Sequence, residues 1–516
     1  MRTARLPEPP DLRARRLALL VVAGLLAAAG VAYELSLLLL GTVTVGATER
    51  ANAVVLGAAM AGMGVGAALG GRLAGRPVAA FVGIEVGLAM VGAAAAPALY
   101  WSWASLDTFW GPLLLVAFAI GACIGAEMPL LAALSDQLAR QRAASVVAKL
   151  TAADYLGAFA GAIAFAFAVR PLLGLVGGTM AIAAVNLVLA AAIPVVMGVP
   201  LRQGAVVVPA AVVLAAMAVA APSVVDDGRQ ALFRDPILAV DDRGPADIVV
   251  TERQHRDGRR DTRLFLDGDL QLSSVDSYRY HEALVHPAVA AAPDRPLDVL
   301  VLGGGDCAAV TEVLRHDRVA SVTLVEIDPR VTEAVRGADG FSELSAGCGD
   351  PRAQLITADA FDWVRRTDRR FDVLVADFPD PDTASLGRLY SVEMFVAARS
   401  VVAADGAITV QCGSPWFAPA AFWTCEATLA EAGWSSTPYL ADVPSFGTWG
   451  FHLAVPDGPA PRVAATEVPG TRYWDGAVAT ASMVLPPDLL VERDQEPSTV
   501  LDPRIVDAHQ RAWFDY

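Results

Sequence analysis

Hydrophobic residues are distributed very unevenly along the chain. Residues 17–221 are almost continuously apolar, whereas residues 223–516 carry most of the charged side chains. About 20 apolar residues are enough for one helix to cross a bilayer. The first apolar segment is too long for a signal-peptide core, so we expect it to be retained. The pattern predicts seven membrane-spanning helices, at about 17–45, 52–75, 78–100, 108–134, 151–169, 172–198 and 204–221.

Positive charge is asymmetric between the predicted loops. Arginine and lysine gather at the amino terminus and after the second, fourth and sixth helices, whereas the opposite loops hold only Arg50 and Arg170. Loops rich in these residues stay in the cytoplasm. We therefore expect a cytoplasmic amino terminus, and seven spans then place the polar part of the chain outside.

Glycines in the second predicted helix follow a helical repeat. Gly62, Gly66 and Gly70 are four residues apart and share one face of the helix. Small residues at this spacing let two helices approach closely. We interpret the stripe as a packing surface; a carrier-like role is the weaker alternative.

Acidic residues interrupt the predicted spans at four positions, Glu34, Glu85, Glu127 and Asp154. A charge inside a bilayer is costly and normally pairs with a base or lines a path for an ion. Two interpretations stay open: pairing between helices, with Arg72, Arg76 or Arg170, or a site for a cation or polyamine.

The polar part begins with short alternating segments. After a polar connector at SVVDDGRQ, two runs alternate as β-strands do, with turns at Asp257-Gly258 and Asp267-Gly268. A helical stretch, SYRYHEALVHPAVAAA, follows. This order predicts a small β domain that leads into a helix.

From residue 297 the pattern changes to buried strands that alternate with helices, which is typical of a doubly wound parallel sheet. The strands are LDVLVL, ASVTLVEID, PRAQLITAD, FDVLVAD and GAITVQCG. The predicted fold is a multi-span helical membrane domain, a small β domain and a Rossmann-like, methyltransferase-type α/β domain. The predicted boundaries are 1–222, 223–290, 291–455 and, for a carboxyl-terminal extension, 456–516.

Composition and charge narrow the function classes. Only 18% of the 516 residues are charged and 55% are hydrophobic, which excludes a wholly soluble protein. The net charge of −16 argues against a nucleic-acid binder. The five cysteines form no CxxC motif and the six histidines no HxxxH pair. We therefore expect neither a disulfide framework nor a metal site.

Four acidic residues lie at the ends of consecutive predicted strands, where ligands bind in such sheets. They are Asp306, Glu326, Asp359 and Asp377. Glu326 follows the second strand at the spacing of an acid that accepts ribose hydroxyls. The turn at Gly303, Gly304 and Gly305 allows close approach of the backbone, but it lacks a pyrophosphate-binding pattern. We favour a nucleoside such as S-adenosylmethionine or a relative over NAD.

The mouth of this predicted pocket is acidic. Asp377 and Asp380 lie in ADFPDPD, and Asp276 and Glu282 flank SYRYHE, with no lysine or arginine near Asp306 in the sequence. Such a site suits a cofactor without a carboxylate and an acceptor that is a polyamine cation. A carboxylate can also take the proton that an attacking amine must lose.

These motifs together resemble the polyamine aminopropyltransferases, or spermidine synthases, and specifically their membrane-fused bacterial subgroup. The resemblance covers about 264–416, with further similarity in the tail. The stretches that carry it are DGDLQLSSVDSYRYHEALVHPAV, VLVLGGGDCAAVTEVLRH, VTLVEIDPRV, ADAFDWV, FDVLVADFPDP, QCGSPW, VPSFGTWGF and STVLDPRIVDAH. The resemblance implies transfer from decarboxylated S-adenosylmethionine as co-substrate to a di- or polyamine, without a metal or a permanently bound cofactor.

The resemblance also implies roles for individual residues. Asp377 is expected to be the general base, and Asp380 and Asp276 to hold the other ammonium group of the acceptor. Asp306 is expected to bind the amino end of the aminopropyl group, beside Gly303 and Gly304. The expected contacts of the nucleoside and of both substrates are Glu326 with the ribose, Asp359 and Ala360 with the adenine, and Gln271, Tyr280 and His281 along the donor and acceptor sites.

Three positions depart from the family pattern. The usual GGGDGG turn is GGGDCA here, the serine pair between the two acids is Phe378-Pro379, and a Thr-Tyr-Pro segment is Asp442-Val443-Pro444. These changes leave the identity of the acceptor open. Two other functions are therefore kept: a polyamine transporter or sensor with a non-catalytic nucleoside-binding domain, and an S-adenosylmethionine-dependent methyltransferase.

The resemblance implies a multi-pass protein of the cell membrane that contacts lipid, with a homo-oligomer as a further expectation. Decarboxylated S-adenosylmethionine is made in the cytosol, and unpaired thiols fit a reducing compartment. We therefore expect the soluble part to be cytoplasmic, against the orientation that the charge asymmetry gives.

Overall fold

A computed structural model of the chain describes residues 10–45, 49–106, 108–138, 143–465 and 468–515. It divides into two compact units. The helical unit comprises Met1–Arg234 and Asp242–Gly244, and the α/β unit comprises Asp235–Asp241 and Pro245–Tyr516. The predicted fold class is confirmed, while the finer domain boundaries inside the second unit stay a prediction.

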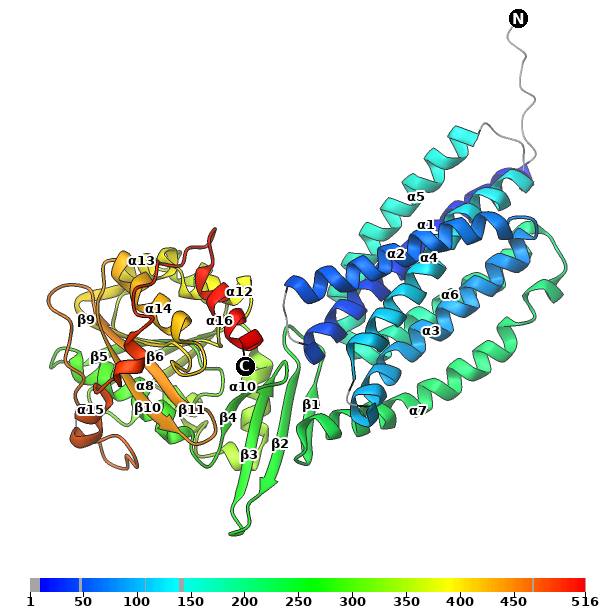
Figure 1. The fold of residues 1–516 in the computed structure, drawn as a ribbon. Coiled ribbons are helices and arrows are strands. Elements are labelled where there is room, and N and C mark those ends of the chain that lie inside the picture. Colours follow the sequence, from blue (N-terminus) through cyan, green and yellow to red (C-terminus); the bar gives the residue numbers. More distant parts are fainter. Residues whose placement is uncertain (1–9, 46–48, 107, 139–142, 466–467, 516) are drawn as a thin grey trace, which may run out of the picture. The chain divides into compact units, whose positions relative to one another are not determined.

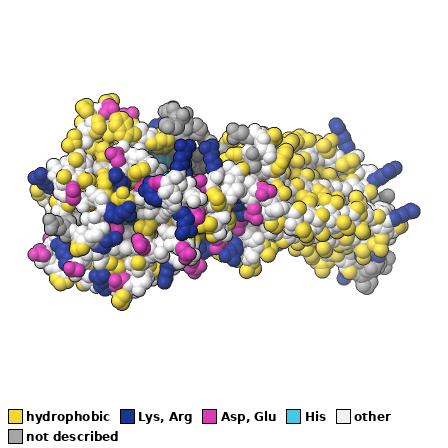
Figure 2. Space-filling view, turned by 90° about the horizontal axis from the view of Figure 1, so that it is seen from below, with side chains coloured by type: hydrophobic (Ala, Val, Ile, Leu, Met, Phe, Trp, Pro, Cys, Tyr) yellow, Lys and Arg dark blue, Asp and Glu magenta, His cyan; other side chains and the backbone are white. Residues whose placement is uncertain are grey.

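The helical unit is a bundle of long apolar helices (Figure 1). The helices are α1 (Pro10–Val45), α2 (Glu49–Leu73), α3 (Pro77–Leu106), α4 (Trp110–Leu138), α5 (Ala143–Ala164), α6 (Arg170–Met197) and α7 (Val207–Phe233). Hydrophobic side chains cover most of the face of this unit that Figure 2 shows, whereas charged groups are scattered over the α/β unit. The unit thus has the apolar exterior that its sequence predicts.

By length and composition the described residues form six candidate membrane spans, of which one runs from Ser145 to Met197. Its 53 residues as a single helix would measure about 80 Å, far more than the hydrocarbon thickness of a bilayer. A π-helical turn at Phe165–Val169 joins α5 to α6, and the chain breaks helical geometry at Gly174, where φ is +66°. This break separates the two helices that the sequence predicts as distinct spans.

The prediction of a polar connector at SVVDDGRQ is wrong, because α7 continues through this segment to Phe233. Val225 and Arg229 are buried here while Asp226 and Asp227 are exposed, so the segment is an amphipathic helical end.

The glycine stripe of α2 packs against α4, as predicted. A Cβ atom at Gly66 would lie 1.9 Å from the carbonyl oxygen of Ala122, and one at Gly62 would lie 2.1 Å from that of Phe118. Gly121 and Gly125 of α4 meet the α2 backbone in the same way. The two helices therefore touch through their backbones.

We expect Gly66→Ala to destabilise the protein by roughly 1–3 kcal/mol, because the added methyl forces α2 away from α4. Gly64→Ala is the matched control on the same helix, since a Cβ there meets nothing within 4 Å. Thermal unfolding in detergent measures both. Equal melting temperatures for the two variants would refute the backbone contact.

A four-stranded antiparallel sheet begins the α/β unit, in the order β1-β2-β3-β4. Its strands are β1 (Ile237–Asp241), β2 (Ile248–Gln254), β3 (Arg260–Leu266) and β4 (Asp269–Ser273). Asp267 and Gly268 both have positive φ, as a two-residue hairpin turn requires. Both predicted turns are present, and α8 (Ser277–Ala291) follows as predicted.

The main sheet has seven strands in the order β10-β11-β9-β8-β5-β6-β7. They are β5 (Leu297–Gly303), β6 (Val319–Glu326), β7 (Ala353–Thr357), β8 (Phe371–Asp377), β9 (Val402–Gln411), β10 (Ser435–Val443) and β11 (Gly447–Val455). The five predicted strands, β5 to β9, are parallel. The antiparallel pair β10–β11 at one edge was not predicted.

Short helices connect these strands and complete the unit (Figure 1). They include α9 (Ala308–Leu314), α10 (Pro329–Gly337), α11 (Ala360–Val364), α12 (Ala384–Gly387), α13 (Val392–Val401), α14 (Pro419–Glu431), α15 (Gly476–Ser482) and α16 (Arg504–Asp515). Ile505 and Val506 of α16 are buried in the same apolar cluster as β8 and β9. The carboxyl-terminal segment is therefore part of this unit.

The expectation of unpaired cysteines is wrong for four of the five. Cys307 is bonded to Cys348, and Cys412 to Cys425, while Cys123 is free. The bonded cysteines are 41 and 13 residues apart in the sequence, so no short motif predicts either disulfide. The compartment argument from free thiols therefore no longer holds.

Candidate active site

The glycine-rich turn after β5 lies directly against two acidic strand ends. Gly303 and Gly304 have φ of +74° and +65°, a conformation that glycine adopts without strain. A Cβ at Gly303 would lie 2.3 Å from the Asp377 carbonyl, and one at Gly305 2.8 Å from the Glu326 side chain. Only glycine lets the turn approach both acids this closely.

Asp377, the last residue of β8, is held by two neighbouring residues of α8. The hydroxyl of Tyr280 donates a hydrogen bond of 2.7 Å to Asp377 Oδ1. His281 Nδ1 lies 2.9 Å from the carbonyl of Ser277, so this nitrogen carries the hydrogen. His281 Nε2 then faces Asp377 Oδ2 at 3.8 Å and Asp306 Oδ2 at 3.7 Å.

The surroundings of Asp377 raise the pKa of its carboxyl to about 6. Burial is the largest cause, and the negative charge of Asp306 acts in the same direction. His281 and the hydrogen bond from Tyr280 lower the pKa in part. A carboxyl with this pKa is ionised at neutral pH yet basic enough to accept a proton.

Asp306 lies beside this carboxyl and precedes the disulfide. Its Oδ1 accepts a hydrogen bond of 2.9 Å from the Ala308 N–H, which fixes the side chain. Cys307 has φ of +68° where the family pattern has glycine. The Cys307 side chain is fully buried and bonded to Cys348, so its bulk lies in the core.

Glu326 and Asp359 follow the next two strands, as expected for a nucleoside site. Glu326 accepts from the N–H groups of Gly305 (3.1 Å) and Asp328 (2.9 Å), and burial raises its pKa to about 7. Asp359 caps α11 ahead of Ala360 and forms an ion pair with Arg388. These residues line the edge of the sheet next to the glycine turn.

Asp380 forms a hydrogen bond with Gln411, which lies at the end of β9. The Gln411 amide donates to Asp380 Oδ1 at 3.4 Å and to the carbonyl of Phe378, and it accepts from the Trp449 indole at 3.0 Å. Burial raises the pKa of Asp380. Gln411 was not assigned a role from the sequence, although it ends a parallel strand like the four acids.

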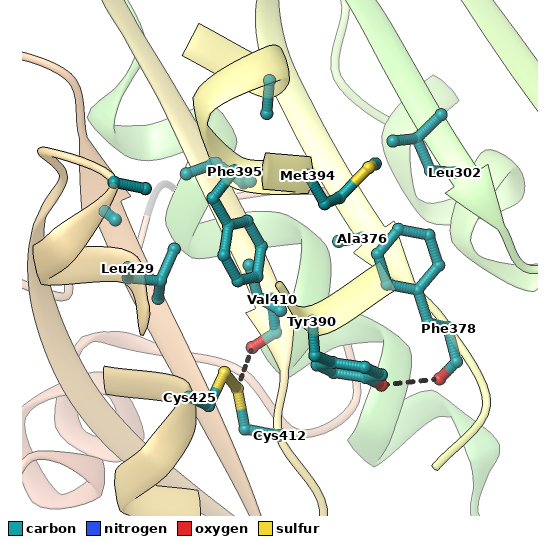
Figure 3. Close-up of a cluster of buried hydrophobic side chains, with 14 of the residues drawn as sticks. Leu302, Ala376, Phe378, Tyr390, Met394, Phe395, Val410, Cys412, Cys425 and Leu429 are labelled. Atoms are coloured by element: carbon teal, nitrogen blue, oxygen red, sulfur yellow. Dashed lines mark hydrogen bonds between the residues drawn. A yellow bond between two sulfur atoms is a disulfide. The ribbon is translucent and has the colours of Figure 1, made fainter. Parts of the chain in front are cut away.

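A rigid apolar core supports the loop that holds Asp377 and Asp380. Figure 3 shows Phe378 beside Tyr390, in the same buried cluster as the Cys412–Cys425 disulfide. The Tyr390 hydroxyl donates to the carbonyls of Phe378 (3.3 Å) and Pro379 (2.9 Å). Phe378 therefore fills the core where the family pattern has a serine.

Further acids gather beside Asp380, and sequence analysis did not single them out. Burial and mutual repulsion raise the pKa of Asp269 to about 6 and that of Asp382 to about 7. Asp267 and Asp380 contribute to this repulsion. The β3–β4 hairpin and the loop after β8 thus form one acidic wall.

An aromatic wall lies close to the acids. The ring of Tyr280 contacts those of Phe446, Trp449 and Phe451 at centroid distances of 6.1, 6.3 and 5.4 Å. Phe446 and Trp449 belong to the β10–β11 hairpin, where the family's tyrosine is absent. Aromatic faces of this kind can pack along methylene groups.

Two predicted residues have other partners in the structure. Both carboxylate oxygens of Asp276 accept hydrogen bonds from Ser445, at 2.7 and 2.9 Å. The Gln271 amide donates to the carbonyl of Asp269 at 3.5 Å. Their roles in substrate binding stay predictions.

The described residues contain two groups that could hold a metal ion. One consists of His281, Asp306 and Asp377, and the other of Cys412, Cys425 and His452. In the second group the two cysteines are already bonded to each other. The expectation of chemistry without a metal stays a prediction.

Comparison with known proteins identifies the family. Over 99% of its length the chain is 41% identical to "Polyamine aminopropyltransferase 1" of Streptomyces coelicolor, covering 98% of that protein. The chain belongs to the polyamine aminopropyltransferase family. It is also 38% identical to the polyamine aminopropyltransferase of Mycobacterium tuberculosis, over 96% of this chain and 97% of that one.

The family model for the spermine/spermidine synthase domain matches residues 277–463. A crystal structure of spermidine synthase with the transition-state analogue AdoDATO is similar, with 25% identity and a TM-score of 0.45, over 50% of this chain and 88% of that one. The curated relatives and the domain match identify the chain as a transferase of the spermidine synthase type. The matched domain contains Tyr280, Asp306 and Asp377.

Proposed function

We propose that the chain transfers the aminopropyl group of decarboxylated S-adenosylmethionine to a di- or polyamine and releases methylthioadenosine. The observation that carries this proposal is the Asp377 carboxyl, with its pKa of about 6, held by Tyr280 between Asp306 and the acidic wall. In this proposal the donor nucleoside binds on the Asp306 side of Asp377, and the acceptor amine binds on the side of the acidic wall.

The reaction is a direct displacement. The acceptor arrives as an ammonium ion and gives one proton to the Asp377 carboxylate, so that its nitrogen has a free electron pair. This nitrogen attacks the methylene carbon next to the sulfonium. The new C–N bond forms as the C–S bond breaks, and the electron pair of that bond stays on sulfur as a neutral thioether.

The donor is proposed to bind along the glycine turn at residues 303–305. In this proposal Glu326 accepts the ribose hydroxyls, Asp359 and Ala360 contact the adenine, and Asp306 holds the ammonium end of the aminopropyl group. The described partners of the Asp306 carboxylate are the Ala308 N–H and His281. A donor that kept its carboxylate would bring that negative charge toward Asp306.

Competition experiments test this donor preference. We expect complete S-adenosylmethionine to inhibit at least 10-fold more weakly than methylthioadenosine, which lacks the carboxylate. Equal or tighter inhibition by the complete molecule would favour a methyltransferase instead.

The acceptor site is proposed to be the acidic wall together with the aromatic wall. Asp269, Asp380 and Asp382 complement ammonium groups, and Phe446 and Trp449 complement the methylene chain between them. A multivalent amine gains from each carboxylate that it reaches. This favours di- and polyamines over monoamines as acceptors.

The rate should depend on the ionisation of Asp377. Below pH 6 this carboxyl is protonated and cannot accept the amine proton, so kcat/KM for the acceptor is expected to fall with an apparent pKa near 6. Tyr280→Phe removes a hydrogen bond that lowers this pKa, so the acidic limb should move to higher pH. A pH–rate profile of both proteins checks the sign; a limb that stays in place would exclude Tyr280 as a positioning residue.

We propose that the helical unit anchors the enzyme in the cell membrane and that the α/β unit faces the cytoplasm, where its co-substrate is made. Its six candidate spans by length and composition support the anchoring. The arginine distribution and the two disulfides favour the opposite side of the membrane.

Reporter fusions after Tyr516 show directly on which side of the membrane the α/β unit lies. Fluorescence of a cytoplasmic reporter without alkaline phosphatase activity is the expected result. Phosphatase activity at this position would overturn the cytoplasmic placement and leave the transfer chemistry unaffected.

A further inference from the structure

The interior of the helical unit contains polar side chains that aminopropyl transfer does not use. Glu85 of α3 and Glu127 of α4 are 0% and 6% exposed. Asn186 of α6, also 0% exposed, donates from Nδ2 to Glu85 Oε2 at 3.1 Å. Tyr33 of α1 is 1% exposed and lies within electrostatic reach of Glu85. We call these four residues the interhelical polar cluster.

Both carboxylates lack a basic partner among the residues that the structure describes. The pairing with Arg72, Arg76 or Arg170 considered from the sequence does not occur for Glu85 or Glu127, for which Asn186 is the one polar side chain bonded to either. The two carboxylates are close enough for their charges to interact. Two negative charges in an apolar bundle are strongly unfavourable unless protons or a cation neutralise them.

Four buried atoms of the cluster have no hydrogen-bond partner among the described residues. They are Glu85 Oε1, Glu127 Oε1, Asn186 Oδ1 and the Tyr33 hydroxyl. Buried polar atoms are rarely left without a partner, because each such atom costs about 1–3 kcal/mol. Asn186 is not an acid, and it is bonded directly to Glu85, so its unpartnered amide oxygen points to a missing ligand independently of the two carboxyls.

The chemistry of these atoms selects the ligand. All four are oxygens, so a soft metal ion that prefers sulfur or nitrogen does not fit. Calcium takes six to eight oxygen ligands, and magnesium needs a nearly complete octahedron of oxygens. Four protein oxygens are therefore too few for either ion without added water. An alkylammonium group carries one positive charge, so it balances one of the two carboxylates while the other keeps its proton. Its three N–H donors match oxygen acceptors in a dry interior.

We propose that the interhelical polar cluster binds the ammonium group of an aliphatic amine inside the helical unit, separately from the catalytic acceptor site. The choice of an amine rests in part on the proposed function, because the α/β unit then acts on the same class of molecule. The helical unit would thus bind the substrate or the product of the enzyme.

Labelling with dicyclohexylcarbodiimide tests the site on the full-length protein in detergent. This apolar reagent reaches buried carboxyl groups and leaves an adduct that peptide mass spectrometry locates. We expect spermidine to slow modification of Glu85 and Glu127 several-fold, while sodium chloride of equal ionic strength does not. Unchanged rates, which indicate two protonated carboxyls without a ligand, or equal protection by sodium would overturn the proposal.

Equilibrium binding of radiolabelled spermidine provides the second test. The wild-type chain should bind two equivalents, and Glu127→Gln should lose one of them. Asp136→Asn is the matched control, because Asp136 is an exposed carboxylate further along the same helix. Equal stoichiometry in wild type and Glu127→Gln would contradict the site.

The two proposals fail in different ways. If spermidine protects Glu85 and Glu127 but no aminopropyl transfer is found, the catalytic proposal fails and the site in the helical unit stands. If transfer occurs and neither carboxylate is protected, only the further site is wrong.

Discussion

Asp377→Asn is expected to lower kcat by about 10²- to 10⁴-fold, the range that a general base contributes. Asparagine has nearly the same shape, and its amide oxygen can still accept the hydrogen bond from Tyr280. The amide cannot take a proton from the acceptor amine at any pH in the working range. The measurement is the initial rate of methylthioadenosine release with saturating donor and amine.

Two controls separate lost chemistry from lost structure. Asp377→Asn should bind methylthioadenosine as the wild type does, because the glycine turn and Glu326 are unchanged. Asp368→Asn, at an exposed aspartate in the loop before β8, should keep full activity. A rate within 10-fold of wild type for Asp377→Asn would remove Asp377 from the role of base.

Asp306→Asn is expected to raise the KM for the donor by about 10- to 100-fold, because a hydrogen bond between charged groups contributes about 1.5–3 kcal/mol. The KM for the acceptor amine should change much less, since the acidic wall is intact. Asparagine keeps an oxygen for the Ala308 N–H, so the turn should hold its conformation.

The same variant should also change the pH dependence. The negative charge of Asp306 raises the pKa of Asp377, so removing it should move the fall of kcat/KM for the acceptor to below pH 6. Steady-state kinetics at several pH values measure both effects. A rise in acceptor KM with unchanged donor KM would mean that Asp306 faces the acceptor instead.

Much of the fold could be predicted from the sequence because each unit has a strong local pattern. Continuous apolar runs determine the helices of the helical unit, and buried strands between Gly303 and Gln411 alternate regularly with helices. The pair β10–β11 was missed because it is antiparallel and has no helix between its strands. The disulfides were missed because Cys307 and Cys348 meet only through tertiary packing.

The candidate site was predictable where it follows from the sheet. Asp306, Glu326, Asp359 and Asp377 share one edge because parallel strands end there. Tyr280 and His281 lie on a helix outside the sheet, so only the resemblance to a family pointed to them. The pattern did not indicate that Asp269 and Asp382 lie near Asp380, or that Phe446 and Trp449 lie near Tyr280.

Mass spectrometry of the products tests the central claim most directly. The purified full-length protein is incubated with decarboxylated S-adenosylmethionine and a panel of mono-, di- and polyamines, beside Asp377→Asn. The account predicts methylthioadenosine together with an equal amount of an amine that has gained one aminopropyl group, from di- or polyamines, and loss of both products in the variant. Methylated products from complete S-adenosylmethionine, or no transfer despite nucleoside binding, would contradict it.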